Sequence, residues 1–123
     1  MVVLACNRNG WGNLCEFITA ARRAAPKGQY HVSLAHSPFA LLQDCEVLLL
    51  PPAGVAAMAW DEAQAQAYLT WARQWWHGHV WLAVQQLLAP DDALRLQRLQ
   101  GWGVQHGIPL VAAGGVLMHA RSR

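Results

Sequence analysis

The run CEVLLLPP, at residues 45–52, decides the fold class of this chain. Its apolar residues have the length and composition of a buried strand, and the two prolines end it because proline cannot donate a hydrogen bond to a strand ladder. Further strands are expected on either side of it, at residues 2–6, 79–85 and 108–113. The sequence therefore predicts about four strands.

A helix is expected after the first strand, beyond a turn. Residues 7–12 have the composition of a turn, and Asn13 with Glu16 three positions later has the spacing of a capping box. Apolar residues at helical spacing follow, and the segment APKG at residues 25–28 ends the helix.

Three later helices are expected at residues 38–42, 61–76 and 90–103, the second of them capped by Asp61. Strands that alternate with helices at this spacing predict right-handed, parallel βαβ units in an α/β fold. The length of 123 residues fits a single domain, residues 1–123, and is too short for a complete (β/α)₈ barrel.

The composition indicates a chain that needs a partner. Charged residues make up 13% of it, about half the usual share, so polar groups are too few to cover its surface. A net charge of +2 is too small for a strong phosphate-binding surface, and direct DNA contact is expected to be weak or absent. Three cysteines without a metal or redox spacing favour a reducing, cytoplasmic location, and no apolar run is long enough for a membrane span.

Chemistry in such folds is expected where the strands end, because those loops converge over one edge of the sheet. The four places predicted to meet there are residues 6–8, 51–52, 85–86 and 114–117. None contains a carboxylate, and Cys6 is the one soft ligand among them, with a buried structural role expected for it. A reaction centre is therefore not expected at this edge.

The segment LACNRNGWGNLCEFIT, at residues 4–19, resembles a stretch of bacterial C-family DNA polymerases, the polymerase III α-subunit group. The likeness continues through RRAAPKGQY at 22–30, WLAV at 81–84, PDD at 90–92 and GIPLVAAG at 107–114. It is strongest to the error-prone branch, which is associated with damage-induced, translesion DNA synthesis and so with DNA repair.

This resemblance implies that the chain is an interior portion of a PHP (polymerase and histidinol phosphatase) domain, a distorted β/α barrel of which about four strands are present. Intact relatives hold Zn or Mn at their strand ends, and some hydrolyse phosphoesters. The polymerase's catalytic aspartates lie outside the resemblance. It therefore implies a structural fragment without nucleotidyltransferase activity of its own, whose partner is the rest of the parent polymerase.

The family's metal site is expected to be degraded in this chain. The family's closing ligand pair falls on Gly115 and Leu117, neither of which has a donor atom in its side chain, and His119 alone cannot assemble a site. The acidic position after the third strand falls on Gln85, a weak oxygen ligand. No cofactor, metal-binding or catalytic residue is expected, and nucleic-acid contacts are not assigned.

Two alternative functions stay open at this point. One is a vestigial metal-dependent phosphoesterase that oligomerisation completes. The other is a nucleotide-binding module that uses the Gly10–Gly12 turn, although Cys15 stands where a third small residue is required.

The remaining notable residues receive structural interpretations. The pair His77 and His79 is expected at the opposite end of the sheet from the strand-end site, as surface imidazoles. Solvated positions are expected for His31, His36 and His106, and a core or interface position for the stripe Tyr68, Trp71 and Trp75. An open sheet with apolar edges is expected to self-associate into a homo-oligomer.

Overall fold

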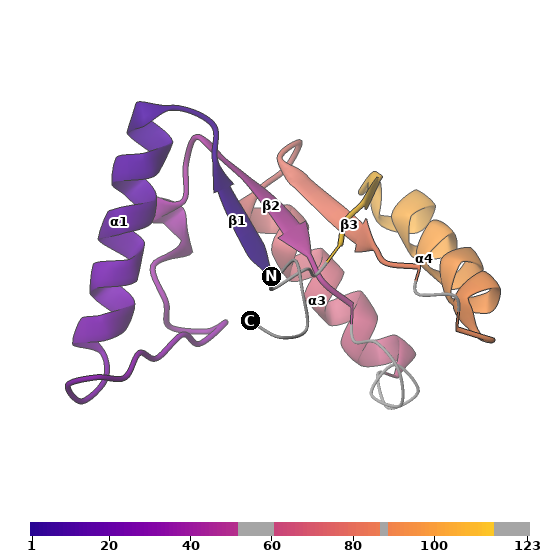
Figure 1. Cartoon of the computed structure of the whole chain (residues 1–123), viewed down its shortest axis with the longest axis horizontal. Coiled ribbons are helices and arrows are strands. Elements are labelled where there is room, and N and C mark those ends of the chain that lie inside the picture. Colours follow the sequence, from indigo (N-terminus) through magenta and orange to yellow (C-terminus); the bar gives the residue numbers. More distant parts are fainter. Residues whose placement is uncertain (52–60, 87–88, 115–123) are drawn as a thin grey trace, which may run out of the picture.

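The computed structural model describes residues 1–51, 61–86 and 89–114, which form an α/β fold (Figure 1). The sheet has four strands in the order β1-β2-β3-β4, and helices lie between them in the chain. The elements are β1 (Val2–Ala5), α1 (Arg8–Arg23), a 3₁₀ turn η1 (Phe39–Leu41), β2 (Cys45–Leu49), α3 (Glu62–Trp75), β3 (Val80–Val84), α4 (Asp92–His106) and β4 (Leu110–Ala112). The predicted strand count and alternation are confirmed.

The sheet is mixed, so the prediction of an all-parallel sheet is wrong for β1. Strand β2 pairs parallel with β3, and β3 pairs parallel with β4, but β1 runs antiparallel to β2, with Ala5 opposite Cys45. The connection explains this direction. Helix α1 runs back along the sheet, and the irregular segment after it returns along α1, so β2 begins at the edge where β1 ends (Figure 1).

Helix α1 begins five residues before the predicted start, because Asn7 rather than Asn13 caps it. The Asn7 side chain accepts a hydrogen bond from the Gly10 amide at 2.9 Å, while the Asn13 side chain donates to the Gln43 carbonyl at 3.0 Å. The predicted turn at Gly10 and Gly12 is therefore helical. A Cβ on Gly10 would lie 2.0 Å from the Asp44 carbonyl oxygen, so glycine is required there by close packing.

The other helices start as predicted, and one ends later. The Asp61 carboxylate accepts from the Gln64 amide at 2.7 Å, which confirms it as the cap of α3. Helix α4 extends beyond the predicted end at Gly103 to His106, and Gly107 ends it with a positive φ of 63°. Gly103 is instead a close contact, since a Cβ there would lie 2.5 Å from Leu110 Cδ1.

The described helices all cover one face of the sheet. Phe17 of α1, Leu69 of α3 and Leu99 of α4 share one core cluster with Val47 and Leu82 of the central strands. Because side chains alternate along a strand, the other face carries a second set of residues, called the open face here. Its members in the four strands are Val2, Leu4, Glu46, Leu48, Trp81, Ala83 and Val111.

Most of the open face is apolar and partly exposed. Val2 and Leu4 have exposed fractions of 39% and 50%, and Leu48, Trp81 and Val111 are half-buried. In Figure 1, α3 lies behind the sheet, on the side away from the open face. One side of the sheet is therefore built as a core, and the other lacks a covering helix within the described residues.

The ring of Phe39 connects the N-terminal and central parts of the core. Its centroid lies 5.4 Å from that of Phe17, 4.9 Å from Trp71 and 5.6 Å from Trp76, and the last two contacts are edge-to-face. The ring is 1% exposed. Trp71 also stacks on Tyr68 at 5.7 Å, which confirms the predicted core position of this aromatic stripe. Within the described residues, no helix is long and apolar enough to cross a membrane.

Replacing Phe39 with alanine should strongly destabilise the fold, because it removes the ring that α1 and α3 share. We expect Phe39→Ala to lower the free energy of unfolding by about 3–5 kcal/mol. Leu94→Ala is the matched control, since Leu94 is 70% exposed, and it should change the value by less than about 0.5 kcal/mol. Urea unfolding followed by tryptophan fluorescence measures both, and equal effects would contradict the central position of Phe39.

Candidate functional site

The predicted strand-end site is only partly assembled. Because β1 is antiparallel, Cys6 lies at the opposite edge from the ends of β2, β3 and β4, and its amide donates to the Asp44 carbonyl at 2.9 Å. Cys6 is also exposed, so the expected buried position is wrong. Pro51, Gln85, Gln86 and Gly114 follow the other three strands. The remaining predicted positions, Pro52, Gly115, Val116, Leu117 and His119, lie outside the described residues.

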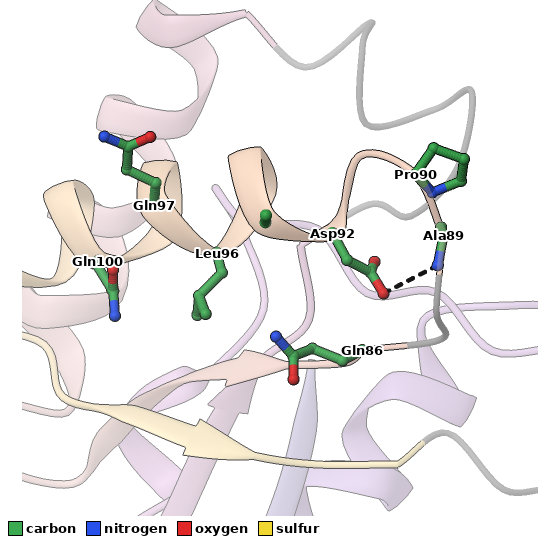
Figure 2. Close-up of a pocket in the computed structure, with 8 residues that line it drawn as sticks. Gln86, Ala89, Pro90, Asp92, Leu96, Gln97 and Gln100 are labelled. Carbon is green, nitrogen blue, oxygen red and sulfur yellow. Dashed lines mark hydrogen bonds between the residues drawn. The ribbon is translucent and has the colours of Figure 1, made fainter.

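A hollow of about 530 Å³ lies at this edge, between the end of β3 and the first turns of α4 (Figure 2). It is lined by Gln86, Ala89, Pro90, Asp92, Ala93, Leu96, Gln97 and Gln100. The side-chain amide of Gln86 lies between the strand end and α4, and Asp92 Oδ2 accepts a hydrogen bond from the Ala89 amide at 3.1 Å (Figure 2). Neutral amides therefore dominate the polar lining, and the one carboxylate stabilises a turn.

These side chains do not fit a cluster of divalent cations. Such clusters need several carboxylate or imidazole ligands, and the described strand ends offer the amides of Gln85 and Gln86. Across the part of the chain that the structure describes, no three His, Cys, Asp or Glu side chains are grouped closely enough to hold a metal ion. The arrangement can form hydrogen bonds but offers little for proton transfer or metal binding.

A carboxylate–imidazole pair occupies the opposite edge of the sheet, at one end of the open face. Glu46 Oε1 lies 2.8 Å from His79 Nδ1, and the indole Nε1 of Trp81 donates to Glu46 Oε2 at 2.6 Å. The His79 hydrogen bond lowers the pKa of Glu46; burial opposes this shift, and the Trp81 hydrogen bond adds to it. The pair fixes the start of β3 against β2.

Sequence reasoning placed His79 at the correct edge but missed its partner. Val47 pairs with Val80, so Glu46 and His79 are neighbours across the two strands. The signal was an acidic residue early in one strand and a histidine just before the next, and it has meaning only once the register is known. His77 is exposed, as expected.

A second polar cluster joins α3 to α4. Glu62 accepts hydrogen bonds from Gln66 Nε2 at 2.7 Å and Trp102 Nε1 at 2.8 Å, and it pairs with Arg98 at 3.4 Å. The Gln66 bond, followed by the Trp102 bond, lowers the pKa of Glu62. His106 is buried and bonds to Gln66 through Nε2, so the solvated position predicted for it is wrong, whereas His31 and His36 are exposed as predicted.

The structure therefore defines an α/β domain with helices on one face of an open sheet and few reactive groups at its strand ends. Comparisons give the relatives of this domain. It is 40% identical over its whole length to an error-prone DNA polymerase of Dechloromonas aromatica, 36% to that of Methylococcus capsulatus, and 34% over 99% of its length to that of Vibrio vulnificus.

The chain resembles a short region of these polymerases, because it spans only 11–12% of their lengths. No family model matches the chain, and no solved structure matches it. The predicted resemblance to error-prone DNA polymerases is confirmed for this region.

The Glu46 pair predicts a loss of stability in acid. A carboxylate whose pKa is lowered by folding stabilises the fold above its ordinary value of 4.5, and this contribution is lost as the pH falls through the lowered pKa. Glu46→Gln should reduce the free energy of unfolding by about 1 kcal/mol at pH 7 and flatten its decline below pH 5.

Urea unfolding at a series of pH values between 3 and 7 measures this effect. The control is Glu16→Gln, at an exposed position of α1, which should leave the pH dependence unchanged. A Glu46→Gln curve parallel to that of the unaltered chain at every pH would show that the pair does not contribute.

Proposed function

We propose that this chain forms an interior portion of the PHP domain of an error-prone DNA polymerase and acts there as structural scaffold. The likeness to such polymerases over at least 99% of the chain supports the parentage. The sequential strand order and the helices on a single face support a segment of a β/α barrel wall, whose other face is turned inward.

The apolar open face is the observation that carries the proposal. A finished single-sheet domain with a row such as Val2, Leu48 and Trp81 on one face would leave that row in water. A barrel buries such a row against side chains of the strands opposite. The partner that completes the fold is therefore the rest of the polymerase, and a cytoplasmic location belongs to the same proposal.

The proposal assigns no reaction to the chain. The described strand ends carry amides where metal ligands are needed, and glycine and leucine at positions 115 and 117 have no donor atoms in their side chains. Synthesis of DNA, and the repair role of the resembled family, are proposed for a parent polymerase only. Direct contact with DNA by this portion is proposed to be weak or absent.

The metal content of the purified chain tests the scaffold role against a phosphoesterase that oligomerisation completes. We expect zinc and manganese well below one equivalent per chain by elemental analysis, and no hydrolysis of p-nitrophenyl phosphate with either metal added. One equivalent of bound metal together with turnover of the ester would overturn the scaffold role.

Self-association through the open face tests the barrel interpretation. The isolated chain should form dimers or larger species at micromolar concentrations, because its apolar face has no other cover. Replacing both Val2 and Leu4 with lysine should shift the sedimentation profile toward monomer by introducing charge on this face.

The matched control replaces Leu94 and Val104 with lysine, two residues of α4 that are 70% and 87% exposed. This change adds the same charge away from the open face and should leave the profile unaltered. A monomeric unaltered chain, or an equal effect of both double variants, would contradict the proposal.

A further inference from the structure

A cavity of about 300 Å³ lies far from the strand-end hollow, between the second half of α1 and the chain that follows it. It is lined by Phe17, Ile18, Ala21, Arg22, Tyr30 and Val32. Five of these six side chains are predominantly apolar, and the volume accommodates a leucine or phenylalanine side chain. The cavity is therefore suited to an apolar anchor rather than to a polar metabolite.

The walls of this cavity are fixed by the fold. Gly28, with a φ of 88°, turns the chain back toward α1, and the His31 amide donates to the Ala21 carbonyl at 2.9 Å. That carbonyl lies in the last turn of the helix, where intrahelical donors run out. Phe17 forms the floor and is itself held by Phe39. The cavity is thus preformed, which lowers the entropic cost of binding.

Apolar side chains around the cavity are more exposed than the fold requires. Ile18 is 45% exposed, Tyr30 76%, Val32 42% and Leu34 51%. They belong to α1 and to the segment that follows it, so they form one apolar surface around a hollow. Clustered exposure of this kind is typical of interaction sites.

The charge around the cavity is positive. Residues 1–36 contain four cationic side chains, those of Arg8, Arg22, Arg23 and Lys27, and a single carboxylate, that of Glu16. Arg22 lines the cavity, and neither it nor Arg23 forms an ion pair with any described residue. A ligand that places carboxylates beside the cavity would pair with these arginines.

We propose that this cavity docks an acidic–apolar peptide segment of a partner protein, with one leucine or phenylalanine side chain inside and flanking carboxylates on Arg22 and Arg23. A second copy of the chain fits poorly, because a symmetric contact would bring two sets of these cations together. Single-stranded nucleic acid fits poorly as well, because Tyr30 is the one exposed aromatic ring at the cavity and bases need stacking surfaces in series.

The test uses the full chain and a fluorescein-labelled twelve-residue peptide with a central Leu-Phe pair and three glutamates on each side. Fluorescence anisotropy should show saturable binding that weakens as salt rises from 50 to 200 mM. Replacing Leu-Phe with Ala-Ala, or every glutamate with lysine, should weaken binding about tenfold or more. Absent binding, or equal binding of the lysine peptide, would overturn the proposal.

Matched variants locate the site on the chain. Tyr30→Ala and Arg22→Glu should each weaken binding about tenfold, whereas Trp11→Ala and Arg8→Glu, at exposed positions near the other end of α1, should change it less than about twofold. Equal effects of both pairs would overturn the assignment. Each variant is first compared with the unaltered chain in urea unfolding.

The same variants distinguish the other occupants. Labelled oligothymidylate of twelve nucleotides that binds more tightly than the acidic peptide and loses affinity in Tyr30→Ala would replace the peptide with nucleic acid. Loss of self-association in Tyr30→Ala would replace it with a second copy. The lysine double variant of Val2 and Leu4 should retain peptide binding, so this proposal can fail or succeed independently of the barrel interpretation.

Discussion

The burial of the Phe39 ring is the interaction on which the rest of the structure depends. Residues 6–44 leave the sheet as a helix and return as a largely irregular segment, and few regular hydrogen bonds hold such a return path in place. Phe39 inserts between Phe17 of α1 and the tryptophans of α3, and this contact ties the return path to the core. The antiparallel position of β1 and the preformed cavity beside α1 both require that tie.

Local sequence signals predicted the elements well where the signal and the tertiary structure agree. The apolar run before Pro51 and the cap at Asp61 specify β2 and α3 without reference to distant residues. The start of α1 could not be decided in this way, because Asn7 and Asn13 are both good caps. The close approach of Gly10 to the Asp44 backbone, a contact 34 residues away in sequence, favours the earlier start.

The direction of β1 and the polar pairs were beyond reach for a related reason. No residue type marks the segment after α1 as a return path, so the usual parallel crossover was the natural expectation. The Glu46–His79 contact depends on the register of β2 and β3, and the burial of His106 depends on the seating of α4 against Gln66. Each is a property of packing between elements, which periodicity within one element does not encode.

The antiparallel pairing of β1 also constrains the order in which the chain becomes structured during synthesis. Strands β2, β3 and β4 each pair with the strand that follows or precedes them in sequence, whereas β1 must wait about 40 residues for Cys45 to emerge opposite Ala5. Until then, the apolar N-terminal run has no described strand beside it, and a nascent chain exposes it to whatever cellular machinery is at hand. The first residues to leave the ribosome thus acquire their neighbours late.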